Sequence, residues 1–392
     1  MFAALSASFF FVNATTFTSL GVALYAMTAD LHWSQTAAGF SFTALGLACG
    51  LASPLPMLVV LRAGGRVTLG LGGLFLAAGF GFASVGTSLA SFYGAMLLVG
   101  LGYAFAGNIA AIFLLSNWFP NRPARAIGLY MMSGALGSTV GPPLVNLLIE
   151  ACGGWRALWR VLAVAALGLA LFCLLTIRDA AAALDDRVET SSAGARTLFQ
   201  AVATPAFLLV AASLTMTMTA ITTIDSIAMP FLAAFGTSPA VVPFVLSTLA
   251  LVDALTRGVA GGLSERIAPA RLLAGGLLLQ GIGSLALIGS TTPPLQYGAA
   301  TLDGLGCGLT YVASNVVLLQ VFGRRVGSEL LSIAWLVSTL AAAGPLAAGI
   351  IADHAGTFSP ILLFYGILFV ALVIPACRLN SRRSTRRVPA LS

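Results

Sequence analysis

Apolar residues form long runs along this chain, and short gaps rich in glycine, proline and arginine separate one run from the next. A helix needs about 20 apolar residues to cross the hydrocarbon core of a bilayer, and these runs have that length. The pattern therefore predicts twelve membrane-spanning helices, at residues 5–29, 35–60, 68–88, 91–116, 125–149, 157–177, 205–229, 241–263, 270–290, 295–319, 327–350 and 358–377. Because this number is even, both ends of the chain are expected on the same side of the membrane.

The arginines are concentrated in alternate gaps. The gaps after the even-numbered spans, together with the tail, hold Arg62, Arg66, Arg122, Arg125, Arg178, Arg187, Arg196, Arg266, Arg271, Arg324, Arg325, Arg378, Arg382, Arg383, Arg386 and Arg387. The opposite gaps hold only Arg156 and Arg160. Cytoplasmic loops of membrane proteins carry an excess of basic residues. We therefore expect a multi-pass protein of the cell (cytoplasmic or inner) membrane, with both termini in the cytoplasm.

Composition supports a lipid-facing exterior. Hydrophobic residues make up 59% of the 392 residues and charged residues 8%, whereas a soluble chain has about a quarter of its residues charged. The net charge of +7 follows the loop pattern, so it is not a signal for nucleic acid. The five cysteines and two histidines have no metal-like or paired spacing, and no nucleophile motif or phosphate loop is present. We expect no metal, no cofactor, no disulfide and no enzymatic activity.

The chain divides into two halves that repeat each other. Gly100-Leu101-Gly102 recurs as Gly304-Leu305-Gly306, and at almost the same offset Gly141-Pro142 matches Gly344-Pro345 and Glu150 matches Asp353. Such matches, each at the same place relative to a span end, indicate a duplicated six-helix unit. We expect an all-α membrane protein with six-helix bundles at 1–177 and 204–378, a polar cytosolic linker at 178–203 and a basic cytosolic tail at 379–392.

Several motifs resemble those of the major facilitator superfamily. The loop after span eight reads Gly261-Gly262-Leu263-Ser264-Glu265-Arg266, similar to the family's loop motif with glutamate in place of aspartate. The matching loop after span two, which runs from Leu61 to Arg66, lacks the acidic residue. Span five carries Gly134, Gly137 and Gly141-Pro142-Pro143 and is followed by Gly154-Trp155-Arg156. The resemblance covers essentially the whole chain and implies a transporter that functions as a monomer, with spans one, four, seven and ten lining a central cavity.

Within that superfamily, two motifs are similar to those of monocarboxylate transporters and oxalate/formate antiporters. Trp118-Phe119-Pro120-Asn121-Arg122 resembles their signature before span five, and Asp253 with Arg257 resembles their acid–arginine pair in span eight. This likeness implies that Arg257 contacts a substrate carboxylate. The chain departs from the group in two places. Span one has no lysine, with Thr18 near that position, and span eleven has no arginine or lysine.

Arg257 is also informative without the resemblance. It precedes the cytosolic Glu265 by eight residues, which places it roughly 12 Å inside the membrane at about 1.5 Å per residue. A charge at that depth needs a partner or a water-filled cavity. Asp253 lies four residues earlier, on the same face of the helix. The pair is either a structural ion pair or a site where Arg257 binds an anion and the displaced Asp253 accepts a proton.

Other residues are weaker candidates. Asp225 in span seven and Asp303 in span ten could carry a coupling proton, because burial favours the neutral carboxyl group; the alternative is a solvated vestibule position. Polar residues that could contact substrate, or simply join helices, are Asn13 and Thr18 in span one, Asn108 and Tyr103 in span four, and Tyr311 and Asn315 in span ten. Glu265 and Arg266, with Arg62 in the matching loop, are candidate gating charges.

The sequence therefore predicts a secondary transporter that moves a small organic monoanion, in the manner of a monocarboxylate carrier, together with a proton. One membrane arginine balances one carboxylate, whereas a dianion would bring a second charge without a partner. The expected partners are the bilayer, a small carboxylate substrate and the proton. Two alternatives remain open: a proton-coupled drug or metabolite efflux antiporter, and an organic-anion exchanger.

Overall fold

The computed structural model describes residues 1–119, 123–177 and 195–379. The regular structure in these ranges is helical, and twelve helical segments are long and apolar enough to cross a membrane. Twelve spans were predicted, and the number is confirmed. The first half consists of α1 (Phe2–Thr15), α2 (Phe17–Leu31), α3 (Gln35–Ala52), α4 (Leu55–Val85), α5 (Leu89–Ala106), α6 (Asn108–Trp118), α7 (Pro123–Cys152) and α8 (Trp155–Thr176).

The second half has its own set of helices. These are α10 (Pro205–Ala234), α11 (Val242–Arg266), α12 (Pro269–Ile288), α13 (Pro293–Val337), the 3-10 helix η2 (Ser338–Ala342), α14 (Ala343–Ala355) and α15 (Ser359–Leu379). A short helix, α9 (Ala195–Val202), lies within the segment expected to be a linker. Residues 178–194 of that segment and nearly all of the predicted tail lie outside the described residues.

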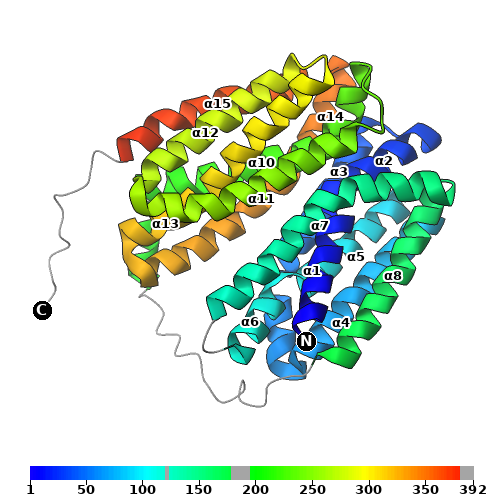
Figure 1. The fold of residues 1–392 in the computed structure, drawn as a ribbon, viewed down its shortest axis with the longest axis horizontal. Helices are drawn as coiled ribbons and strands as arrows, with labels where there is room; N and C mark the ends of the chain where they lie inside the picture. Colours follow the sequence, from blue (N-terminus) through cyan, green and yellow to red (C-terminus); the bar gives the residue numbers. More distant parts are fainter. Residues whose placement is uncertain (120–122, 178–194, 380–392) are drawn as a thin grey trace, which may run out of the picture.

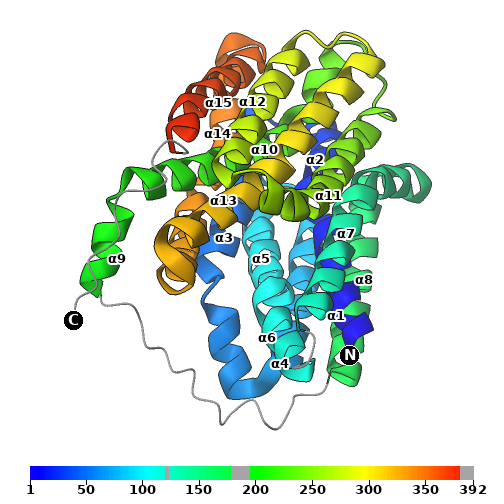
Figure 2. The same cartoon turned by 60° about the vertical axis from the view of Figure 1, so that its left-hand side comes forward.

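The two halves form two helical bundles that lie side by side (Figure 1). We call the end of the molecule that holds Met1 and Leu379 the terminal face, and the opposite end, with the loops at 32–34, 153–154, 236–241 and 356–358, the distal face. Most contacts between the bundles run along three helix pairs: α3 with α14, α7 with α11, and α2 with α10. Helix α9 lies beside the second bundle, where it contacts α10 and α13 (Figure 2).

Several spans are broken in ways that the apolar pattern did not predict. Span two was expected as one helix over 35–60, but α3 ends at Ala52 and α4 begins at Leu55. Pro54 lies between them, and proline lacks the N–H group that a continuous helix needs. Two helices run on from one span into the next and turn sharply at a glycine in a predicted gap: α4 at Gly64 (φ 84°) and α13 at Gly323 (φ 78°). Positive φ angles favour glycine, so these positions end one span and begin the next.

Span one is two helices, and its polar side chains explain the join. Thr16 separates α1 from α2 and has non-helical backbone angles (φ −109°, ψ −121°). The last carbonyl groups of a helix have no partner within that helix. The hydroxyl groups of Thr18 and Ser19 donate to the carbonyl oxygens of Asn13 and Ala14 at 3.0 and 2.6 Å. Those of Thr15 and Thr16 add bonds to the carbonyl oxygens of Phe11 and Val12, at 2.8 and 2.6 Å. The polar cluster therefore holds the break together.

The glycines of span five allow α7 to approach α1 closely. A Cβ atom at Gly134 would meet the ring of Phe9, one at Gly137 would meet the backbone of Phe10, and one at Gly141 would meet the carbonyl group of Ala14. Small residues at such positions let two helix backbones pack directly against each other. This part of the family motif is therefore explained by packing within the first bundle.

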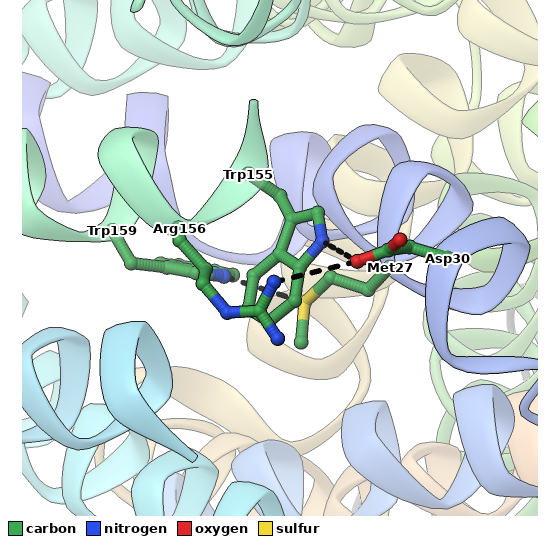
Figure 3. Close-up of polar contacts among 5 residues, drawn as sticks. All are labelled: Met27, Asp30, Trp155, Arg156 and Trp159. Carbon is green, nitrogen blue, oxygen red and sulfur yellow. Dashed lines mark hydrogen bonds and ion pairs between the residues drawn. The ribbon is translucent and has the colours of Figure 1, made fainter. Parts of the chain in front are cut away.

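The Gly154-Trp155-Arg156 motif holds the distal end of span one. The indole N–H of Trp155 donates to Oδ2 of Asp30 at 3.0 Å, and Nη1 of Arg156 lies 3.4 Å from the same oxygen (Figure 3). One turn further along α8, the indole of Trp159 donates to the sulfur of Met27 at 3.3 Å. These contacts tie α2 to α8, so the distal half of span one is held to its own bundle.

Candidate functional site

Arg257 and Asp253 form a two-point ion pair on α11. Nε of Arg257 donates to Oδ1 of Asp253 at 2.9 Å, and Nη2 lies 2.6 Å from Oδ2. The planar guanidinium group matches the two oxygens of a carboxylate in this geometry. The side chain of Arg257 remains 35% exposed and that of Asp253 14% exposed. An incoming anion therefore has access to the guanidinium group.

Helix α13 completes the surroundings of the pair. A Cβ atom at Gly304 would meet the carbonyl oxygen of Leu249, and one at Gly308 would meet that of Asp253, so α13 packs directly against the backbone of α11. This close packing places Tyr311 under the guanidinium group, 4.0 Å from its carbon to the ring centroid. Cys307 lies one turn earlier, with its sulfur 4.0 Å from Nη2 of Arg257. The cation is thus held by a carboxylate, an aromatic face and a thiol.

The first bundle contributes aromatic side chains opposite this pair. Tyr103 of α5 lies close enough to interact electrostatically with Arg257 and Tyr311. Its ring packs edge-on against Phe17, at the start of α2, with centroids 5.3 Å apart. On the other side, Tyr311 packs against Trp335 with centroids 5.3 Å apart. The candidate site therefore lies between the bundles, where a charged group in one bundle faces aromatic rings from both.

Three of the predicted polar candidates satisfy the backbone of their own span. Asn13 donates to the carbonyl oxygen of Phe9 at 2.8 Å, and Thr18 to that of Asn13 at 3.0 Å. Asn315 donates to the carbonyl oxygen of Tyr311 at 2.7 Å, one turn from the Arg257 contact. The amide groups of both asparagines keep further hydrogen-bonding capacity, whereas the hydroxyl hydrogen of Thr18 is already used.

Asn108 differs from these, because its side-chain oxygen is buried without a hydrogen-bond partner among the described residues. It opens α6, directly after the break in span four at Gly107. The hydroxyl group of Tyr130 donates to the carbonyl oxygen of Gly107 at 3.2 Å and so supports the break. A buried amide oxygen without a partner is costly, so Asn108 remains a candidate for contact with a polar substrate group.

The two other membrane aspartates occupy different places. Asp303 points toward α12, where it lies over Gly283 and accepts a hydrogen bond from Ser284 at 3.4 Å. The structure therefore does not bring it together with Arg257. Asp225 lies on α10, 4% exposed, where α10 crosses α2 of the other bundle. It interacts electrostatically with Asp253.

The candidate gating charges lie at the terminal face. Arg266 ends α11 and lines a cavity of ≈ 340 Å³ between the start of α12 and the α13 residues Val316 and Gln320. Arg62 is exposed on α4, before the turn at Gly64. The side chain of Glu265 is not among those described, and neither is Arg122 of the motif before span five. A gating role for these charges stays a prediction.

Contacts between the bundles, as far as the described residues show them, gather toward the distal face. The carboxylate of Asp353 on α14 accepts hydrogen bonds from the backbone N–H groups of Gln35 and Thr36, at 3.0 and 2.9 Å. It therefore caps the N-terminus of α3 in the other bundle. Further along α3, Thr43 donates to the carbonyl oxygen of Ala342 in η2 at 2.6 Å. Sequence reasoning matched Asp353 to Glu150 as a repeat but did not assign it this contact.

Comparison with known proteins agrees with this architecture. The profile of the Major Facilitator Superfamily matches residues 6–232 and again residues 222–391. Among solved structures, the nucleoside transporter NupG superposes with a TM-score of 0.79 at 12% identity, over 96% of this chain and 98% of that one. A bacterial homolog of the human lysosomal transporter Spinster, in an inward-facing and occupied conformation, superposes with a TM-score of 0.73 at 16% identity. The superposition covers 97% of this chain and 94% of that one. These TM-scores, over nearly the whole of each chain, establish a shared fold.

Relatives in sequence match over shorter stretches. The uncharacterized transporter YycB of Bacillus subtilis is 36% identical over 157 residues, which are 38% of this chain and 38% of that protein. Monocarboxylate transporter 12 of Mus musculus is 34% identical over 113 residues, 29% of this chain and 23% of the mouse protein. Monocarboxylate transporter 12-B of Danio rerio is 28% identical over 144 residues, which are 36% of this chain and 30% of the zebrafish protein. Each match spans well under half the length of the relative.

Proposed function

Because this chain belongs to the Major Facilitator Superfamily, and is thus a multi-pass transporter and not an enzyme, we propose that it carries a small organic monoanion together with a proton. The substrate is a monocarboxylate or a close analogue. Transport proceeds by alternating access, with the site between the bundles open first to one face and then to the other. Both termini lie in the cytoplasm, as the arginine distribution favours, and the membrane is the cell membrane.

The arrangement of Asp253 and Arg257 is the observation that carries this proposal. The guanidinium group already binds one carboxylate at two points, so a substrate carboxylate can take the same geometry. Asp253 is then left without its counter-charge in a membrane environment, where the neutral form of a carboxyl group is favoured. It takes up a proton as the substrate binds. One anion and one proton therefore enter together, and the charge of the site does not change.

The missing second cation limits the substrate class. Spans one and eleven contain no arginine or lysine. A dianion would place its second carboxylate among the aromatic rings of Tyr103, Tyr311 and Trp335. Neither span one nor span eleven supplies a basic side chain there. Desolvating that charge without a partner is costly. The names of the mouse and zebrafish relatives point to the same substrate class.

A proton-coupled efflux antiporter is the competing function, but the site favours it less. A cationic drug would have to displace Arg257 from Asp253, and it would then meet the guanidinium charge at close range. An anion meets attraction instead. An efflux screen in a host that lacks its main drug pumps would separate the two functions.

Uptake by proteoliposomes tests the proposal. A panel of labelled monocarboxylates is offered under an inward proton gradient to the wild type and to Arg257→Gln, with Arg160→Gln as control because Arg160 is exposed at the distal face. We expect gradient-driven uptake of at least one monocarboxylate. Loss of a charge-assisted hydrogen-bonded pair should lower it about ten- to hundredfold in Arg257→Gln and leave it unchanged in the control. Uptake that survives in Arg257→Gln would refute the role of Arg257.

A further inference from the structure

Asp225 lies at a close crossing of the two bundles, where α10 packs against α2. On α2, Gly21 faces the backbone of Asp225 so closely that a Cβ atom at position 21 would collide with the carbonyl oxygen of Asp225. Asp225 itself is 4% exposed. It is nine residues from the end of α10 at Ala234, and Gly21 is ten residues from the end of α2 at Leu31, so the crossing lies in the distal half of both spans. No room remains there for a hydration shell.

This carboxyl group has no counter-charge. It forms no hydrogen bond or ion pair in the described part of the chain. Asp253 of α11 interacts with it electrostatically, but Asp253 is also acidic and its own charge is matched by Arg257. The unmatched negative charge that ionised Asp225 would bring is therefore buried at a helix crossing.

Other titratable or charged side chains lie on the helices packed against α10, and none of those described forms a hydrogen bond or ion pair with Asp225. They are Tyr25 and Asp30 on α2, Cys49 on α3, Arg257 and Arg266 on α11, Tyr297, Asp303, Cys307, Tyr311 and Glu329 on α13, Asp353 and His354 on α14, and Tyr365, Cys377 and Arg378 on α15. Several are engaged elsewhere: Asp30 with Arg156, Asp303 with Ser284, and Tyr365 with Thr223.

The α2–α10 crossing belongs to an interface that transport must open. α2 is tied to the first bundle through Asp30 and Met27 (Figure 3), while α10 belongs to the second. Alternating access separates the bundles at one face while they close at the other. When the distal face opens, Asp225 gains access to water. When it closes, Asp225 returns to the buried position seen here.

We propose that Asp225 is the proton site that controls closure of the distal face, which rests on the proposed function of proton-coupled transport. An ionised carboxylate cannot be buried at this crossing without a partner, whereas a neutral carboxyl group can. The distal face therefore closes only after Asp225 has taken a proton from that side. Release of the proton toward the terminal face restores the charge and drives the distal face open again. Each cycle therefore carries a proton across the membrane and returns the empty carrier to the state with its distal face open.

The two aspartates therefore have different roles. Asp253 balances the substrate charge at Arg257, while Asp225 couples proton binding to the movement of the bundles. The same proton need not serve both residues in every state, but only Asp225 lies at the crossing itself.

Distance measurements that need no substrate test the proposal. Spin labels are placed at Thr87 in the first bundle and Thr291 in the second, both exposed near the distal face, in a background with the exposed Cys152 and Cys377 replaced by serine. Separation is measured by double electron–electron resonance across a pH series. We expect the wild type to shift from a short to a longer distance as pH rises, because ionised Asp225 opens the distal face.

Asp225→Asn mimics the neutral form and should remain at the short distance throughout the series. Asp303→Asn is the matched control, because Asp303 is equally buried but faces α12 within one bundle, and it should respond as the wild type does. Asp225→Glu, which can still ionise, should keep the response. Size-exclusion profiles confirm that each variant is folded. If Asp225→Asn still opens with rising pH, or if Asp303→Asn loses the response, the proposal is wrong.

The outcome is independent of the substrate. A pH response that depends on Asp225, in a protein that transports no monocarboxylate, would uphold this inference and refute the proposed substrate. Monocarboxylate uptake that depends on Arg257, with no effect of Asp225→Asn on the distance distribution, would uphold the proposed substrate and refute the role of Asp225.

Discussion

Arg257 is held by groups that differ in how easily they can be displaced. The carboxylate of Asp253 makes two contacts with it, at 2.6 and 2.9 Å, but can become neutral by taking a proton. The ring of Tyr311 stays in place whatever the protonation state. A substrate carboxylate can thus replace Asp253 while the aromatic contact keeps the guanidinium group in position.

Tyr311 should therefore contribute through its ring and not through its hydroxyl group. A cation–π contact is worth about 0.5–2 kcal/mol. Tyr311→Phe should leave the KM for the transported anion nearly unchanged, whereas Tyr311→Ala should raise it by roughly two- to thirtyfold. Initial rates of uptake over a range of substrate concentrations measure this. An equal loss in both variants would show that the hydroxyl group is what matters.

A double-mutant cycle separates the contribution of the Asp253–Arg257 pair to stability from its proposed role in transport. Asp253→Asn leaves a membrane arginine without its counter-charge, so the thermal unfolding temperature in detergent should fall, and Arg257→Gln should lower it as well. The double variant removes both charges and should recover much of the loss, while transport stays absent. Recovery of transport together with stability would mean that the pair is purely structural.

Asp253 and Arg257 could be identified from the sequence because residues four apart share a helix face. Their surroundings could not be. Tyr311 reaches the guanidinium group only because Gly304 and Gly308 bring α13 against α11, and no local pattern reports that packing. Asn13 and Thr18 were predicted from their polarity alone, which does not distinguish a cavity position from a side chain that caps a helix break.

Helix crossings in this molecule depend on glycines of two kinds. Gly134, Gly137 and Gly141 pack α7 against α1 within one bundle, whereas Gly21 and Gly39 pack helices of one bundle against the other. A Cβ atom at Gly39 would meet the carbonyl oxygen of Pro345 on α14. The first kind lies within one bundle, whereas the second joins the two bundles near the distal face. Alternating access would require only contacts of the second kind to separate.

Substitutions should separate these two kinds. Gly137→Leu overfills a permanent contact and should lower stability by about 1–3 kcal/mol. Gly21→Leu should leave the fold intact, prevent closure of the distal face and abolish transport. Gly168→Leu is the control, since a Cβ atom there meets nothing within 4 Å. Thermal unfolding and modification of distal cysteines are measured together. Equal destabilisation by Gly21→Leu and Gly137→Leu would contradict the distinction.

The cap that Asp353 provides for α3 acts across the bundles, so it too should bias the conformational equilibrium. Loss of an N-cap costs about 1 kcal/mol, which corresponds to roughly a fivefold change in the ratio of states. Asp353→Ala should shift the population toward the open distal face by about that factor. Glu150→Ala, at the matching position of the repeat, should not, because Glu150 accepts a hydrogen bond from Asn146 of its own helix. Label accessibility at the distal face measures the shift.

At the level of whole elements, the apolar pattern gave the number of spans but not their breaks. The joins at Thr16 and Gly107 and the 3-10 turn before Ala343 lie inside continuous apolar runs. Hydropathy does not distinguish a broken span from a straight one, because the hydrogen bonds that support a break come from hydroxyl groups on other turns or helices. The break at Pro54 was not predicted either, although the effect of proline on a helix is local.

Considered as one body, the molecule has its bundles joined along the distal halves of α2, α3, α7, α10, α11 and α14. Twelve spans and two bundles followed from hydropathy and from the internal repeat, because both are properties of the sequence alone. Which face is open did not follow from the sequence, because every open or closed state is built from the same twelve helices. The contacts of Asp353, Gly21 and Gly39 identify the distal face as the closed one here.

The central claim is that an anion and a proton cross together through the site at Arg257. Simultaneous recording of labelled substrate uptake and internal acidification in proteoliposomes tests it directly, with the membrane potential clamped at zero. We predict that acidification accompanies anion uptake and that both fluxes are lost in Arg257→Gln. Anion uptake without acidification, or coupled uptake that survives in Arg257→Gln, would contradict the account.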